Sequence, residues 1–330
     1  MFHRHLSITG NRSVFAHSIV LVFAIGYILG VIPMSWGVPV LELEPQMDVQ
    51  LPPPTLEELS DSLRRGQYTE VLRSGRALLA KNPKAPVYGL FSVALAGLER
   101  FDDASKAIEK AKATGEPNHR FFAHISQAMI SHGQDKYDSA ISECRKAIRL
   151  KPRHPLAYHI LGLAYFGKQD HQQAEKHLKK AIEVEPEFAH AHTTLGANFL
   201  VQKKAREAFA SYRKATEIDP KDSRPHMGLG TIYTGMRMFY HAINEYETVL
   251  RLNPGTHQAH VRLSALYLQV GKYDDAITEA KAILQKDAQS AEAHFTLGRA
   301  HGFKNQFDEA VEHLNQLVNL QPDSIEGYWT

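Results

Sequence analysis

The sequence predicts an all-α solenoid built from pairs of helices. The prediction rests on three residues that recur at fixed positions in a repeated pattern. A Leu-Gly pair recurs every 34 residues, beginning at Leu161, Leu195 and Leu229. When each 34-residue unit is numbered from 1, this glycine stands at position 8, an alanine at position 20 and a proline at position 32. Two small positions on either side of a short turn let two antiparallel helices approach closely, and the proline ends the second helix. This close packing offsets the cost of about 1 kcal/mol that a glycine carries inside a helix.

The units account for most of the chain. Six regular units of 34 residues lie end to end over residues 121–324, and two looser units precede them over residues 51–120. We number the units one to eight, and residues 325–330 follow unit eight as a short remnant. In unit one, Thr55 and Glu58 have the spacing of a capping box, which predicts that a helix begins there. The regular units are 121–154, 155–188, 189–222, 223–256, 257–290 and 291–324.

The amino-terminal part of the chain differs from the units. Residues 1–13 form a basic segment, and residues 14–37 carry no Asp, Glu, Lys or Arg. The apolar stretch over residues 14–32 has 19 residues, close to the roughly 20 that a membrane-spanning helix needs. The same segment also fits a signal peptide, because Ser35-Trp36-Gly37 offers a cleavage site of small residues near Gly37. We favour the retained transmembrane anchor and keep cleavage near Gly37 as the alternative.

Charge on either side of the apolar segment predicts its orientation. Arg4 and Arg12 precede it, and Glu42 and Glu44 follow it. The positive-inside rule therefore places the amino terminus in the cytoplasm and the repeat domain outside the cytoplasm. We expect a single-pass protein of the inner membrane, or a secreted or periplasmic protein if the segment is cleaved. Residues 38–54 contain five prolines and predict a semi-extended linker between the membrane and the repeats.

Composition excludes several classes of function. The chain has 38 Lys and Arg against 36 Asp and Glu, so it lacks the basic surface that nucleic acid requires. Its single cysteine, Cys144, excludes an internal disulfide and a cysteine-based zinc site. The units leave no room for a separate catalytic domain, and the sequence has no phosphate-binding loop or nucleophile elbow. We therefore expect no enzyme, no catalytic residue and no cofactor.

The repeated pattern resembles the tetratricopeptide repeat over about residues 51–324. The resemblance rests on the order of Leu-Gly, aromatic residue, alanine, aromatic residue and proline in a period of 34. It implies a right-handed superhelix of helix pairs, whose concave face is lined by the first helix of each pair and holds a peptide or a segment of another protein. The aromatic residues at positions 11 and 17 include Tyr165, Phe199, Tyr233 and Tyr267, with Phe101, Tyr137, Phe239, Tyr273 and Phe307.

The resemblance also indicates which residues face a partner. In the family the concave face is lined mainly by positions 2, 5, 9, 12 and 13 of the first helix. No unit has the Lys at position 5 or the Asn at position 9 with which some members clamp a terminal carboxylate. The alternative is that these apolar side chains only pack between neighbouring units. The predicted partner-binding residues are Ile125, Met129, His159, Leu163, Phe166, Leu200, Met227, Val261, Leu268 and Phe295.

Histidine is frequent, and five units have it at position 4. Neighbouring units stack about 8 to 10 Å apart, which is too far for these imidazoles to share one metal ion, so we expect no metal site. We interpret them as amphipathic packing residues and keep a pH-responsive ladder as an alternative. The position-4 histidines are His124, His192, His226, His260 and His294.

Together these features predict a non-catalytic protein-interaction scaffold that is exported, membrane-tethered and active in assembling an envelope complex. Its partner would be an apolar-rich peptide or protein segment in the concave groove. The alternative function is a self-assembling unit, because only "IEGYWT" follows unit eight and a repeat array needs a polar cap at its end. A pH- or metal-responsive histidine-rich protein is the third alternative.

Overall fold

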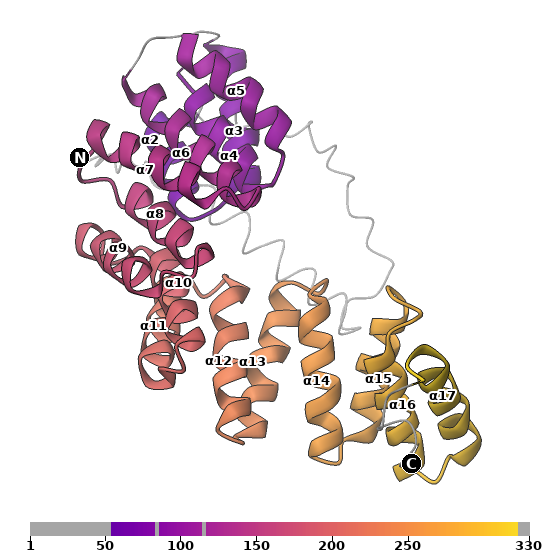
Figure 1. Ribbon diagram of the computed structural model, residues 1–330. Helices are drawn as coiled ribbons and strands as arrows, with labels where there is room; N and C mark the ends of the chain where they lie inside the picture. Colours follow the sequence, from indigo (N-terminus) through magenta and orange to yellow (C-terminus); the bar gives the residue numbers. More distant parts are fainter. Residues whose placement is uncertain (1–53, 83–85, 114–116, 323–330) are drawn as a thin grey trace, which may run out of the picture. The chain divides into compact units, whose positions relative to one another are not determined.

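The computed structural model describes residues 54–82, 86–113 and 117–322, and these residues form an all-α array of helix pairs (Figure 1). The predicted fold class is confirmed, since the described residues contain 16 helices in consecutive helix-turn-helix pairs. The pairs are α2 (Leu56–Arg64) with α3 (Tyr68–Lys81), α4 (Tyr88–Gly97) with α5 (Phe101–Ala113), α6 (Pro117–Gly133) with α7 (Tyr137–Leu150), α8 (Pro155–Gly167) with α9 (His171–Val184), α10 (Ala189–Val201) with α11 (Ala205–Ile218), α12 (Ser223–Gly235) with α13 (Phe239–Leu252), α14 (His257–Gln269) with α15 (Tyr273–Leu284), and α16 (Ala291–Phe303) with α17 (Phe307–Leu320).

Local sequence signals set the ends of these helices. The capping box at the start of α2 is confirmed: the Glu58 amide donates to Thr55 Oγ1 over 3.1 Å, and the Thr55 amide donates to Glu58 Oε2 over 2.8 Å. Most second helices end two residues before the predicted proline, as α9 does ahead of Pro186. Such a proline cannot continue the helix because it lacks an amide hydrogen.

In four helix pairs a glycine at position 8 makes room for a large side chain at position 24. A Cβ added to Gly196 would lie 2.8 Å from Cδ1 of Tyr212, whose ring is 4% exposed. Gly162 would meet Cγ of Leu178 at 2.7 Å in the same way. The glycine at position 8 is therefore required because a large side chain from the second helix fills the space where a Cβ would stand.

Units three and seven have a small residue at both positions, whereas in unit two Ser92 at position 8 stands opposite Ile108. Where position 8 holds Ala128, position 24 is the small Cys144, and where position 8 holds Ser264, position 24 is Ala280. Cys144 is completely buried, and burial raises the pKa of its thiol, so it acts as a small apolar side chain. Native packing density leaves no space for a large residue at both positions.

The third helix pair begins with a longer helix than the pairs that follow. The first helix α6 has 17 residues, whereas α8, α10, α12, α14 and α16 have 13 each. The additional turn follows the two extra residues of unit two, and α4 packs against α6 as extensively as against its own partner α5. Buried Ser126 on α6 donates a hydrogen bond of 2.7 Å to the Ser92 carbonyl on α4.

Four predicted segments fall wholly or largely on residues that the structure does not describe. Residues 1–53 include the predicted basic segment, anchor and nearly all of the linker, and residues 323–330 include the carboxyl-terminal remnant. Among the described helices, none combines the length and the hydropathy that crossing a bilayer requires.

We expect Gly196→Ala to lower the free energy of unfolding by about 1 to 3 kcal/mol, because the new methyl group would overlap the buried Tyr212 ring. The matched control is Gly302→Ala on α16, where an added Cβ meets nothing within 4 Å. That change should instead stabilise the protein by about 0.5 to 1 kcal/mol through helix propensity. Thermal unfolding followed by circular dichroism measures both, and equal effects of the two substitutions would contradict the packing role of position 8.

Candidate protein-binding groove

The inner face predicted to bind a partner is covered in one half of the array and open in the other. At position 5, Ile125 is 0% exposed and His159 is 7% exposed. The corresponding side chains of units six to eight, Met227, Val261 and Phe295, are only half-buried. The ten predicted residues therefore do not form one uniform surface.

Position 2 shows the same division. Phe122, Leu156 and His190 are 8%, 6% and 8% exposed, whereas Gln258 and Glu292 are exposed. Both inner positions change from buried to accessible along the array, so neighbouring units alone do not cause the burial of the first half. Additional chain must lie against units three to five.

The first helix pair supplies this cover. The turn between α2 and α3 reaches the start of α10, where a Cβ on Gly66 would lie 2.3 Å from Nε2 of His190. Gly66 also has a φ of +69°, a conformation that favours glycine. Next to this turn, Nη1 of Arg64 lies 3.5 Å from Oε2 of Glu185. Unit one thus packs against units four and five, although more than 100 residues separate them in sequence.

Buried imidazoles lie beneath this cover. Nη2 of Arg224 donates to Nδ1 of His190 over 2.6 Å, and Nε2 of His159 lies 3.0 Å from Oγ1 of Thr194. Burial, together with the adjacent Arg224 guanidinium, lowers the pKa of His190 to about 4. Burial also lowers the pKa of His159 well below its usual range and the pKa of His154 to about 4. These rings are therefore neutral in the folded protein.

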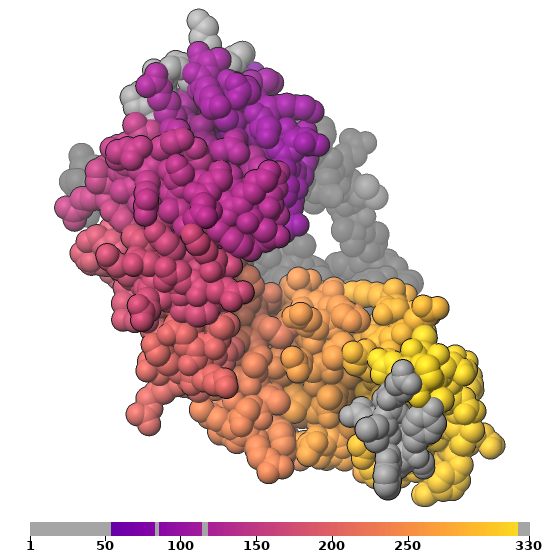
Figure 2. All heavy atoms as spheres, in the orientation of Figure 1, coloured from indigo at the N-terminus to yellow at the C-terminus, as the bar shows by residue number. Residues whose placement is uncertain are grey.

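The open half of the inner face contains two adjoining hollows. The larger has a volume of about 580 Å³ and is lined by Leu268 and Phe295, both predicted residues, together with residues of α15 and of the rest of α16. The smaller has a volume of about 250 Å³ and is lined by Val261 and Phe295. The two share Ala265 and Thr296, so they form one continuous surface between α14 and α16. Figure 2 shows α12 to α17 as orange to yellow spheres.

The other predicted residues lie outside these hollows. Met129, Phe166, Leu200 and Met227 are half-buried and pack against the hydrophobic core of neighbouring helices. Leu163 is also half-buried. Packing between units therefore buries part of the surface of these side chains.

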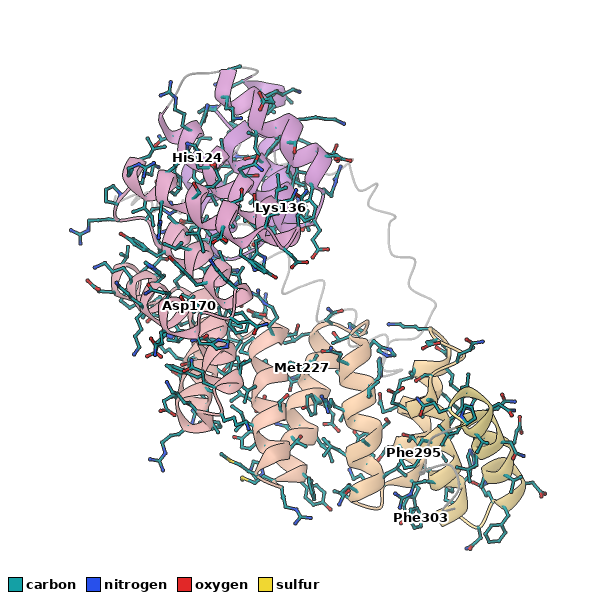
Figure 3. The ribbon with its side chains drawn as sticks, viewed as in Figure 1. His124, Lys136, Asp170, Met227, Phe295 and Phe303 are labelled. Carbon is teal, nitrogen blue, oxygen red and sulfur yellow. The ribbon has the colours of Figure 1, made fainter. Side chains whose placement is uncertain are left out.

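Two residues that the prediction omitted complete the larger hollow. Arg299 and Phe303 follow Phe295 at intervals of four on α16, and Figure 3 labels both phenylalanines on this helix. Cζ of Arg299 lies 5.6 Å from the ring centroid of Phe295 and 5.3 Å from that of Phe303. Spacing by four residues was the available signal, since it places all three side chains on one helix face.

The position-4 histidines connect the two helices of a pair. Nδ1 lies 2.7 Å from a glutamate oxygen in both His124–Glu143 and His226–Glu245, where the partner stands 19 residues later. His192 differs, because its Nε2 lies 2.9 Å from the carbonyl oxygen of Pro186. In unit eight a histidine replaces the glutamate, and the two Nδ1 atoms of His294 and His313 lie 3.1 Å apart. These histidines are packing residues with a polar partner.

Acidification should destabilise the covered half of the array. A folded-state pKa of about 4 for His190, against about 6.5 when unfolded, means that the unfolded state binds more protons as pH falls below 6.5. The loss should reach roughly 2 kcal/mol at pH 5 for such a group. We expect His190→Gln to flatten the pH dependence of chemical unfolding between pH 7.5 and 5. The half-buried His192 provides the control substitution His192→Gln, and an equal flattening by both would disprove the assignment to His190.

Family models support the repeat assignment directly. Four models described as "Tetratricopeptide repeat" match residues 123–154, 155–188, 241–291 and 267–330. No curated protein matches the sequence.

Solved structures share the fold at low sequence identity. "Functional Characterization of Pseudomonas Aeruginosa pilF" is 21% identical with a TM-score of 0.58, covering 64% of this chain and 96% of that one. "Crystal structure of YrrB: a TPR protein with an unusual peptide-binding site" is 20% identical with a TM-score of 0.52, covering 56% and 95%. "Crystal structure of APC/C hetero-tetramer Cut9-Hcn1" is 16% identical with a TM-score of 0.65, covering 82% of this chain but only 53% of that one. The helix pairs, the family matches and these folds agree: the chain is a tetratricopeptide repeat protein.

Proposed function

We propose that this protein is a non-catalytic scaffold that binds an apolar-rich segment of another protein on the open inner face of units six to eight. The observation that carries the proposal is the change at position 5, from buried Ile125 and His159 to half-buried Val261 and Phe295. A partner can reach the second group but not the first. Every described helix belongs to a repeat pair, so the described part of the chain contributes a binding surface and no separate catalytic domain.

The lining of the hollows favours an apolar partner. Leu268, Val270, Tyr273, Phe295 and Phe303 surround the larger hollow and leave room for a large side chain in about 580 Å³. Burying such a side chain contributes about 1.5 to 3 kcal/mol. An apolar helix or an extended segment in this groove would use the recognition mode of helix-in-groove complexes.

We further propose that the repeat domain lies outside the cytoplasm, held at the inner membrane by residues 14–32. Support comes from the sequence, where Arg4 and Arg12 precede the apolar segment and Glu42 and Glu44 follow it. One similar structure is described as "Crystal structure of PilW, widely conserved type IV pilus biogenesis factor", at 18% identity and a TM-score of 0.53. Assembly of an envelope complex is the process we propose for this chain.

The groove proposal predicts which aromatic residues a partner needs. Phe295→Ala with Phe303→Ala should lower partner affinity by more than tenfold, because both rings line the larger hollow. Proteins cross-linked to the full chain in membranes, identified by mass spectrometry, would be depleted for the double variant. Phe307→Ala is the matched control, since Phe307 is 64% exposed but lies on α17 outside the hollow.

The same control separates the second candidate function, self-assembly. Phe307 and Val311 are 64% and 56% exposed on α17, the final helix of the described array, and a second copy of the chain would find an apolar surface there. If Phe307→Ala removes the cross-linked species and the Phe295 and Phe303 substitutions do not, the chain is a self-assembling unit and the groove proposal is wrong.

Topology is tested with a reporter enzyme that is active only after export. Fused behind residue 60, it should be active in cells, because the charge difference across the apolar segment exports everything that follows. Replacing Arg4 and Arg12 with glutamate should reduce this activity severalfold by weakening the orientation signal. An inactive fusion to the natural sequence would place the repeats in the cytoplasm.

A further inference from the structure

Arg299 is a charged residue in a hollow that is otherwise lined by apolar and uncharged side chains. It is the one ionised side chain among the residues that line the larger hollow. Within the described residues, Arg299 forms no ion pair, whereas Lys304 on the next turn pairs with Asp274. Arg299 is exposed, so a carboxylate of a partner can reach its guanidinium and accept two parallel hydrogen bonds from it.

The guanidinium of Arg299 is held in place by aromatic rings. It lies over the rings of both Phe295 and Phe303, with its Cζ 5.6 Å and 5.3 Å from their centroids. Phe303 is itself fixed, because it stacks on Tyr273 with centroids 5.0 Å apart and planes 15° from parallel. These cation–π contacts orient the guanidinium, and because Arg299 is exposed its N–H groups are accessible to a carboxylate.

A second charge gives the surface a direction. Glu292 is exposed, lines the smaller hollow and stands seven residues before Arg299 on α16, about 10 Å away along the helix axis. An acidic group of a partner is therefore attracted to the Phe303 end and repelled from the Glu292 end. In an extended segment, about 10 Å corresponds to about three residues.

We infer that the hollows of units seven and eight recognise an acidic, apolar protein segment: a bulky apolar side chain fills the space beside Phe295, and an Asp or Glu carboxylate of the same segment binds Arg299. The two hollows are continuous through Ala265 and Thr296, so the segment passes along the groove. This inference rests on the proposed groove and adds the charge that its partner carries.

Random peptide display on the full chain in detergent tests the inference with a defined probe. Peptides selected by the natural protein should be enriched in Asp or Glu within a few positions of Phe, Leu or Ile. Selection on Arg299→Gln should keep the apolar enrichment and lose the acidic one, and Arg299→Glu should enrich Lys or Arg instead. Arg262→Gln, an exposed arginine on α14 outside both hollows, should select the same peptides as the natural protein.

The best selected peptide then tests the ion pair itself. Replacing its acid by the amide, or Arg299 by Gln, should each weaken binding about tenfold, and both together should weaken it little more than either alone. Acidic enrichment that survives Arg299→Gln, or additive losses in this cycle, would overturn the inference and leave the groove proposal intact. Failure to select any peptide that depends on Phe295 and Phe303 would instead overturn the groove proposal, and the inference with it.

Discussion

The contact between a glycine at position 8 and a large side chain at position 24 is the interaction on which four of the helix pairs depend. Gly196 leaves the space that the Tyr212 ring occupies, and where position 8 gains a side chain, as at Ala128, position 24 is reduced to Cys144. In these pairs no large residue stands at both positions, so the two helices can approach closely. Successive pairs then stack, and the stacked first helices together form the inner face. The binding surface is therefore a product of packing within the pairs.

Local signals made most of this fold predictable from the sequence. The capping box at Thr55, the small residues at positions 8 and 20 and the prolines at position 32 act within one helix or one helix pair, so their effects can be read in a short window. The cover over units three to five could not be predicted in this way. It depends on Gly66 meeting His190, and this contact joins parts of the chain that share no periodic relationship.

The sequence predicted only part of the candidate site. Family positions led to Val261, Leu268 and Phe295, which do line the open hollows. Position 13 is also one of these family positions, but the predicted set did not include Phe303. In units two to four this position is a glycine, and Gly133 and Gly167 receive the aromatic ring of the preceding unit. At Phe303 the ring of Tyr273 stacks instead of inserting. One departure from the pattern therefore exposes an aromatic surface and places Arg299 beside it.

The complementary sizes at positions 8 and 24 also limit how such a protein can be recombined. Exchanging whole units keeps each glycine with its own large partner. Exchanging only second helices between units three and four would place Leu178 against Ala128 and leave Cys144 opposite Gly162, creating a clash in one pair and a void in the other. Recombination within the turn of a helix pair would therefore destabilise the fold, whereas recombination between units would preserve the packing of each pair. The unit that can be exchanged in this array is the whole helix pair, because the side chains that must fit together lie within one pair.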